Sequence, residues 1–184
     1  FMVAVGDWIL RLACRQARCL AANGDFRLAV NVARQQFDQE GLAAMVADVL
    51  AETGFPARCL ELEVTEEVIL RDMPRSRAVL GQLQALGARI ALDDFNARSS
   101  LTDLAEFPLD IIKLDRSLVS NIDDAPAQRA IAAAVVNLAN NLGVETVAEG
   151  VETAAEQAAL RALGCDAVQG FHVCGPMDAV GFTV

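Results

Sequence analysis

Ionisable and amide side chains occur in this sequence where short apolar segments end. The set comprises Asn31, Glu61, Glu63, Glu66, Asp93, Asp94, Lys113, Asp115, Glu149, Glu152 and Gln169. Carboxylate and amide oxygens without a nearby His or Cys cluster are hard ligands, which suit Mg²⁺ or Mn²⁺ better than zinc. Asn31, Glu63, Asp93 and Asp94 are therefore candidate metal ligands. Because several acids in one pocket would raise one another's pKa, we expect one divalent ion there, or two.

A metal site with a lysine and a further carboxylate beside it predicts chemistry on phosphate esters. Two ions about 3.5 to 4 Å apart can clamp an in-line phosphoryl displacement and generate hydroxide near neutral pH. Lys113 can neutralise a phosphate oxygen or hold the nucleophilic water, and Glu149 can accept the proton of that water. We interpret His172, the only histidine, as a structural or surface residue.

These side chains need a scaffold that brings the ends of several strands together. Short apolar strands are predicted at residues 28–32, 60–65, 89–92, 110–114, 145–148 and from 166 onward. Helices are predicted at 8–22, 41–52, 75–86, 101–106, 126–142 and 154–163, the last of them after a capping box from Thr153 to Glu156. This alternation predicts an α/β fold with a parallel sheet, whose functional groups gather at the carboxyl edge. Residues 1–184 are predicted to form a single domain.

Composition limits the partners and the compartment. The chain has 15 Lys and Arg against 25 Asp and Glu, and this net charge of −10 repels duplex nucleic acid. The apolar run at 130–136 is far shorter than the roughly 18 residues that cross a bilayer, so no membrane span is expected. Five cysteines without zinc-site spacing favour reduced thiols and a cytoplasmic location. The first residues lack the features of a signal peptide, and we expect the chain to be cut from a longer one.

Five blocks of the sequence resemble, in order, the motifs of the EAL domain family. They are Leu60–Glu66, Leu92–Phe95, Ile111–Asp115, Val147–Thr153 and Gly164–Gly170, and Val30–Phe37 resembles an earlier block less closely. The resemblance implies a TIM-like (β/α) barrel that binds cyclic di-GMP and hydrolyses it to linear pGpG with Mg²⁺ or Mn²⁺. A full barrel takes about 250 residues, so we expect about six βα units here. The first part of the barrel, with the Glu of the family's name motif, is expected upstream of Phe1.

The resemblance also implies a role for each polar residue. Asn31, Glu63 and Asp93 resemble direct metal ligands, and Asp94 a ligand of a second ion. Lys113 and Glu149 resemble the pair that activates water. The substrate-binding or loop-supporting set comprises Gln169 as a polar contact in the pocket, Glu152 as a residue that steadies a neighbouring loop, Glu66 and Asp115.

One loop departs from the family pattern. The family reads DDFGTGYSSL after the third strand, whereas residues 93–101 are one residue shorter and lack both glycines. Glycine permits backbone angles that other residues adopt at a cost, so this loop must take another path. Because every catalytic position of the family that this chain can show holds the expected residue, the favoured function is a metal-dependent cyclic di-GMP phosphodiesterase. The altered loop supports the alternative, a cyclic di-GMP-binding receptor with impaired turnover. A generic aldolase or isomerase barrel, or a structural domain, is a third reading.

The resemblance also bears on neighbouring domains and on the oligomeric state. An upstream sensor or cyclase domain is expected in the full-length protein. Whether the domain forms a homodimer is left open.

Overall fold

The alternation of strands and helices that the sequence predicts is present in the computed structural model, which describes residues 2–23, 26–97 and 105–177. The chain divides into two units. Unit 1 comprises residues 1–91 and 106–109, and unit 2 comprises residues 92–105 and 110–184. Strand β3 (Arg89–Phe95) contributes its first three residues to unit 1 and its last four to unit 2.

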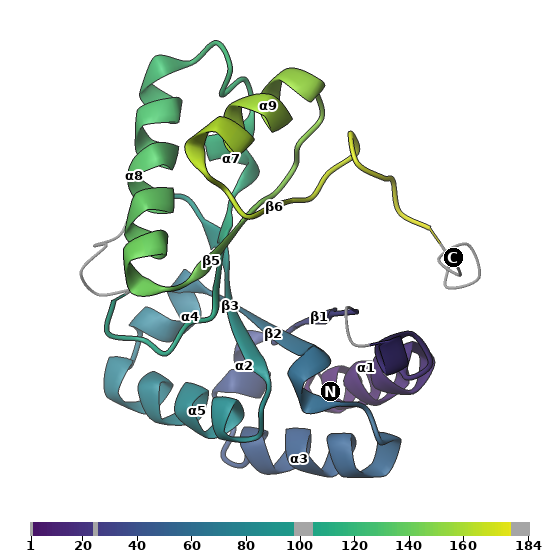
Figure 1. Ribbon diagram of the computed structural model, residues 1–184. Coiled ribbons are helices and arrows are strands. Elements are labelled where there is room, and N and C mark those ends of the chain that lie inside the picture. The colour runs from purple at the N-terminus through teal and green to yellow at the C-terminus, as the bar shows by residue number, and fades with distance from the viewer. Residues whose placement is uncertain (1, 24–25, 98–104, 178–184) are drawn as a thin grey trace. The chain divides into compact units, whose positions relative to one another are not determined.

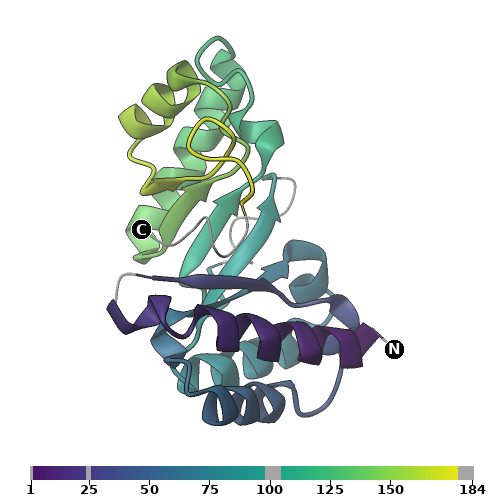
Figure 2. The ribbon, with the colours of Figure 1, turned by 90° about the vertical axis from the view of Figure 1, so that its right-hand side faces the viewer.

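Unit 1 contains two further strands and most of the helices of the N-terminal half. Its elements are α1 (Met2–Ala17), a 3-10 turn (Leu20–Asn23), β1 (Leu28–Asn31), α2 (Arg34–Phe37), α3 (Leu42–Thr53), a second 3-10 turn (Ala57–Cys59), β2 (Leu60–Thr65), α4 (Glu66–Leu70) and α5 (Met73–Ala85). The strand order is β1-β2-β3, and β1 pairs with β2 in parallel so that Asn31 lies opposite Glu63. Helices α1 and α3 contact each other, and Figure 2 shows α1 in dark purple.

Local sequence explains where these elements begin and end. Helix α3 ends at Gly54, whose φ of 65° is left-handed and whose N–H donates to the Leu50 carbonyl. Helix α5 begins after Asp72, whose side chain accepts from the Arg75 N–H. The core of the unit is apolar, and Val46, Leu62 and Leu80 are almost fully buried in it.

Unit 2 continues the pattern. Its elements after β3 are β4 (Ile111–Leu114), α7 (Arg116–Val119), α8 (Pro126–Leu142), β5 (Glu145–Ala148), α9 (Ala154–Leu163) and β6 (Ala167–Val168). The strand order is β3-β4-β5-β6, and β5 pairs in parallel with both β4 and β6. Pro126 occupies the first turn of α8, where its missing N–H costs no hydrogen bond, and Gly143 ends this helix at a φ of 71°. Figure 1 shows α7, α8 and α9 around these strands.

Both units confirm the predicted α/β class, with parallel strands in chain order. The first helix differs from the prediction, because it begins at Met2 and Asp7 lies inside it instead of capping it. Asp7 pairs with Arg11 one turn later at 3.0 Å, so the helix continues through it. Residues 101–104 of the predicted helix at 101–106 lie outside the described residues.

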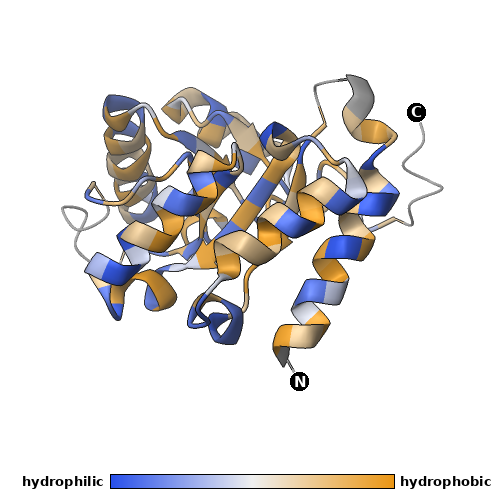
Figure 3. Ribbon diagram, turned by 90° about the horizontal axis from the view of Figure 1, so that it is seen from below, coloured by the Kyte–Doolittle hydropathy of each residue, from blue (hydrophilic) through white to orange (hydrophobic). Residues whose placement is uncertain are grey.

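No helix in the described part of the chain is both long enough and apolar enough to cross a membrane. Figure 3 shows the reason, since hydrophilic and hydrophobic residues alternate along the helices.

Candidate functional site

Three strand ends in unit 2 bring four charged side chains together. Asp93 and Asp94 lie in β3, Lys113 lies in β4, and Glu149 follows β5 directly. Lys113 Nζ lies 2.5 Å from Glu149 Oε1 and 3.5 Å from Asp93 Oδ1. The Lys113 side chain is only 6% exposed, so both ion pairs form in an environment that screens charge poorly. Lys113 is also the single lysine of the sequence.

Backbone hydrogen bonds fix the relative positions of these strand ends. The Asp115 N–H donates to the Phe95 carbonyl at 2.9 Å, which joins the end of β4 to the end of β3. The Glu149 N–H donates to the Leu114 carbonyl at 3.0 Å, which joins the residue after β5 to the end of β4. The side chains of Lys113 and Glu149 therefore meet because parallel pairing continues up to the residues that carry them.

The carboxylates of this cluster form a donor set for a cation. Asp93, Asp94 and Glu149 each offer an oxygen, and these three oxygens lie within 4.8 Å of one another. The buried Asp93 Oδ1 makes no hydrogen bond in the described structure, although Lys113 lies at ion-pair distance. A distance of 3.5 Å is too long for a good hydrogen bond, so this oxygen remains available as a ligand. A hard divalent ion fits such a set of oxygens.

The surroundings of Asp94 also favour a bound cation, because they raise the pKa of its carboxyl group. Burial raises the pKa of Asp94, and the negative charges of Asp93 and Asp115 raise it further, against an opposing effect of Lys113. The backbone of Asp94 has a φ of 55°, a conformation that costs energy for a residue other than glycine. Strain of this kind is often found at functional sites, where the surrounding structure enforces it.

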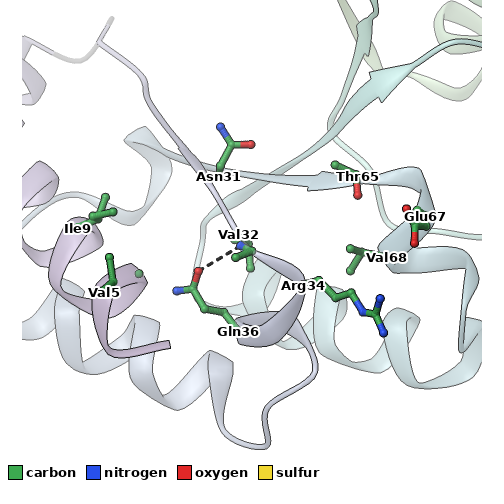
Figure 4. Close-up of a pocket in the computed structure, with 11 residues that line it drawn as sticks. Val5, Ile9, Asn31, Val32, Arg34, Gln36, Thr65, Glu67 and Val68 are labelled. Carbon is green, nitrogen blue, oxygen red and sulfur yellow. Dashed lines mark hydrogen bonds between the residues drawn. The ribbon is translucent and has the colours of Figure 1, made fainter. Parts of the chain in front are cut away.

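Unit 1 carries the other two predicted metal ligands. Asn31 ends β1, Glu63 lies opposite it in β2, and Glu63 is buried whereas Asn31 is exposed. Asn31 also lines a cavity of about 350 Å³ at the ends of these strands. In Figure 4, Val5 and Ile9 of α1 lie on one side of this cavity and Thr65 lies on the other.

The remaining predicted residues occupy different surroundings. Glu66 is the first residue of α4, and its Oε1 is buried without a hydrogen-bond partner among the described residues. Asp115 caps α7 by accepting from the Ser117 N–H at 2.9 Å. Burial acts to raise the pKa of Asp115, but hydrogen bonds from Ser117 and from the Arg116 backbone outweigh it, and the pKa is lowered.

Glu152 and Gln169 line a second cavity, of about 440 Å³, within unit 2. Glu152 forms an ion pair with Arg116 at 2.6 Å, and both side chains are exposed. The exposed ring of Phe171 lines the same cavity.

Sequence reasoning missed three residues that shape this site. Arg116 pairs with Glu152, and both lie three positions after the Lys113 and Glu149 of the inner pair, a spacing from which the outer pair could have been inferred. Gly150 has a φ of 71°, and a Cβ there would lie 2.7 Å from the Arg116 Cγ. Glu156 was predicted only as part of a helix cap, yet it is buried and accepts hydrogen bonds from two loops.

Comparisons with known proteins point in one direction. The family model described as EAL domain matches residues 1–176. The chain is 39% identical over 181 residues to the bifunctional diguanylate cyclase/cyclic di-GMP phosphodiesterase MucR of Pseudomonas aeruginosa, covering 97% of this chain and 26% of that protein. It is 35% identical over 183 residues to the cyclic di-GMP phosphodiesterase PdeR of Escherichia coli, covering 98% of this chain and 28% of that protein. The chain thus spans about a quarter of the length of these curated relatives.

Solved structures extend the likeness to the fold. The MucR phosphodiesterase in complex with cyclic di-GMP matches with a TM-score of 0.91 at 39% identity, over 98% of this chain and 74% of that one. A manganese and cyclic di-GMP complex of BlrP1 from Klebsiella pneumoniae matches with a TM-score of 0.84 at 31% identity, over 92% of this chain and 44% of that one. These likenesses confirm the predicted TIM-like α/β fold class.

Proposed function

The chain belongs to the EAL domain family, and from that premise we propose that it contains the metal-dependent site at which cyclic di-GMP is hydrolysed to linear pGpG. The observation that supports this most directly is the buried lysine between two carboxylates. Lys113 lies 2.5 Å from Glu149 and 3.5 Å from Asp93, beside an Asp93 oxygen that makes no hydrogen bond in the described structure. The names of the relatives and the cyclic di-GMP complex of MucR support the choice of substrate.

The donor atoms support Mg²⁺ or Mn²⁺ as the cofactor, and two ions are part of the proposal. In unit 2, Asp93 and Asp94 would hold an ion through hard oxygen atoms. In unit 1, Asn31 and Glu63, which lie opposite each other in β1 and β2, keep their proposed roles as ligands through the same kind of donor. Divalent ions at such a site supply charge that stabilises a phosphoryl transition state and lowers the pKa of bound water. The manganese complex of BlrP1 is consistent with this choice of metal.

In the reaction, Glu149 serves as the general base and Lys113 orients it. The Lys113 ammonium holds the Glu149 carboxylate in an ion pair at 2.5 Å, beside Asp93, where Glu149 can accept a proton from the attacking water. The same ammonium can donate a hydrogen bond to that water or to a phosphate oxygen. Because Lys113 is buried, its position is set by β4 and not by solvent.

Substrate contacts would come from the cavity lined by Arg116, Glu152 and Gln169. These side chains offer donors and acceptors for a nucleobase, and the exposed ring of Phe171 offers a stacking surface. Glu66 and Asp115 would support the loops around the site, Asp115 by capping α7.

One observation favours the alternative hypothesis, in which the protein is a cyclic di-GMP-binding receptor with impaired turnover. Ala97 has a φ of 58°, in the loop where the family pattern has glycine. A residue held at this angle stores strain, and a displaced loop would slow the chemical step while leaving nucleotide binding intact. Residues 98–101 of this loop lie outside the described residues.

The setting of the domain is also part of the proposal. We infer a cytoplasmic location and cyclic di-GMP as the partner. We also infer that the full-length protein has further domains, such as those implied by the bifunctional name of MucR. A homodimer is the oligomeric state to test.

The deciding experiment incubates the intact protein with cyclic di-GMP and Mn²⁺ and measures pGpG by chromatography. We expect hydrolysis by the wild type, loss of turnover in Glu149→Gln with retained nucleotide binding by calorimetry, and full activity in Asp123→Asn, which changes an exposed loop carboxylate. Wild-type protein that binds cyclic di-GMP without hydrolysing it would support the receptor reading. Wild-type protein that does not bind the nucleotide would contradict both.

A further inference from the structure

The capping box at the start of α9 makes more hydrogen bonds than a helix cap requires. Thr153 Oγ1 accepts from the Glu156 N–H at 3.1 Å, and Glu156 Oε2 accepts from the Thr153 N–H at 3.0 Å. These two bonds complete the cap. Glu156 Oε2 also accepts from the Glu152 N–H at 2.9 Å, and Glu156 Oε1 accepts from the Asn121 N–H at 3.0 Å. Two of these four hydrogen bonds therefore join Glu156 to backbone groups outside the capping box of α9.

Glu156 is placed for strong interactions. Its residue is only 6% exposed, so its carboxylate is shielded from water. Burial acts to raise the pKa of Glu156, but the backbone and Thr153 hydrogen bonds outweigh it, and the pKa is lowered. Hydrogen bonds to an ionised acceptor are about twice as strong as neutral ones, so this carboxylate binds its three backbone amides firmly.

The amides that Glu156 binds belong to the loops that carry the candidate catalytic pair. Glu152 lies three residues after Glu149, in the loop from β5 to α9. Asn121 follows α7, the short helix that begins three residues after Lys113, and the ψ of 127° at Ser120 turns the Asn121 N–H out of the helical path. Figure 1 shows α7 beside α9, and the Asn121 bond joins their ends. One buried carboxylate thus connects the exits of β4 and β5.

The segment between Glu149 and Glu152 contains no helix, so its position depends on such ties. Gly150 packs on the Arg116 side chain, and the Val151 N–H donates to the Gln169 carbonyl at 3.1 Å. The contact from Glu156 to the Glu152 N–H comes from a buried carboxylate. A shift of this segment would change the 2.5 Å contact between Lys113 and Glu149.

We propose that Glu156 is a positioning residue that holds the β4 and β5 exit loops at the separation where Lys113 meets Glu149. Its kinetic consequence rests on the proposed function, whereas its effect on the loops does not. Glu156 lies outside the cluster of reacting groups and acts through the backbone N–H groups of Asn121, Glu152 and Thr153.

The test compares Glu156→Ala with Thr153→Ala in the intact protein. Thr153→Ala removes the Thr153 hydroxyl that caps α9, at a cost of about 1 kcal/mol, and leaves the three amides bound to Glu156. We expect Glu156→Ala to lower kcat for cyclic di-GMP about 100-fold with KM changed less than about threefold, because a misplacement of about 1 Å can have this effect. Thr153→Ala should stay within about twofold of wild type, and Glu156→Gln, which keeps one acceptor oxygen, should recover part of kcat.

Amide hydrogen exchange gives a readout that does not depend on turnover. The amides of Asn121, Glu152 and Thr153 should exchange faster in Glu156→Ala and keep their protection in Thr153→Ala. If the two variants lose kcat equally, or if these amides keep their protection in Glu156→Ala, the proposal is wrong. If the wild type does not hydrolyse cyclic di-GMP, the proposed function fails, and the exchange measurement alone decides the role of Glu156.

Discussion

Lys113 is the residue on which the geometry of the candidate site depends. Its ammonium is the positive charge that contacts both Asp93 and Glu149, and it comes from a strand interior where neighbouring residues are buried. Removing one partner of a buried ion pair leaves the other charges uncompensated, which is more costly than the pair itself is stabilising. Stability and catalysis therefore depend on the same atom, and a substitution must be examined for both.

We predict that Lys113→Met lowers both the melting temperature and kcat. The loss of stability should reach about 3 kcal/mol without a divalent ion, because Asp93 and Glu149 then face each other without a cation. Added Mn²⁺ should restore part of the melting temperature but not kcat, since the ion neutralises the carboxylates without orienting Glu149. Thermal unfolding with and without Mn²⁺, together with pGpG formation, measures both effects. Arg129→Met, which removes an exposed cation, should change neither, and an active Lys113→Met would exclude the assigned role.

A second prediction concerns Ala97, whose φ of 58° is unfavourable for a residue with a Cβ. Ala97→Gly should stabilise the protein by about 1 kcal/mol, because glycine adopts this angle without a steric cost. The gain is offset in part by the greater freedom of glycine in the unfolded chain. Urea unfolding of the two proteins measures the difference. A clear loss of stability in Ala97→Gly would mean that the left-handed angle is not strained here.

At the scale of elements, the short connections after β4 and β5 decide the geometry more than the helices do. Each connection turns within a few residues, and each is fixed by side chains that bind backbone groups, namely Asp115 on Ser117 and Glu156 on Glu152. Carboxylates that accept hydrogen bonds from backbone N–H groups stabilise the fold more when they are ionised than when they are protonated. The integrity of this edge of the sheet should therefore depend on pH.

The prediction for pH follows from the lowered pKa of Glu156. A carboxyl group whose pKa is lower in the folded state stabilises the protein above its unfolded pKa of about 4.3, and this contribution is lost as pH falls through the folded pKa. The free energy of unfolding of wild type should exceed that of Glu156→Gln by a constant amount from pH 7 down to about pH 5, and the difference should shrink below the unfolded pKa of about 4.3. Urea unfolding of both proteins at several pH values measures it. A difference that stays constant below that pKa as well would show that the charge of Glu156 does not contribute.

Much of this architecture could be predicted from the sequence, and the exceptions have physical reasons. Strand ends such as Asp93 and Lys113 were predictable because buried apolar runs and polar exits follow a local pattern. The start of α1 was not, since Asp7 is as suitable for an i,i+4 pair with Arg11 as for a cap. The bond from Asn121 to Glu156 spans 35 positions in the chain, and a contact of this kind depends on tertiary packing that no local pattern encodes.

At the scale of the whole molecule, the net charge of −10 and the acidic cluster act together. An excess of acid concentrates divalent cations near the surface and repels an anionic nucleotide. A cation bound among Asp93, Asp94 and Glu149 would remove part of the repulsion where the nucleotide must approach. Metal binding should therefore change the stability of the whole chain as well as its affinity for the substrate.

We predict that Mn²⁺ raises the melting temperature through Asp93. At a free Mn²⁺ concentration 100 times Kd, linkage gives about 2.7 kcal/mol of added stability for one site that is absent from the unfolded chain. Asp93→Asn should lose most of this gain, and Asp123→Asn should keep it. Thermal unfolding in an Mn²⁺ series, with EDTA as the reference, measures the gain. Equal gains in Asp93→Asn and in wild type would place the ion elsewhere.

The presence of one lysine, buried at the centre of the candidate site, also makes this chain suited to magnetic resonance. Lysine labelled with ¹³C at its ε-carbon would give one side-chain resonance from this chain, without assignment work and without crowding from surface amines. The chemical shift and titration of that resonance would report the ionisation of the very group that contacts Glu149 and Asp93. Metal or nucleotide added to the sample would thus be followed at the reacting centre itself, in variants that retain no turnover to assay.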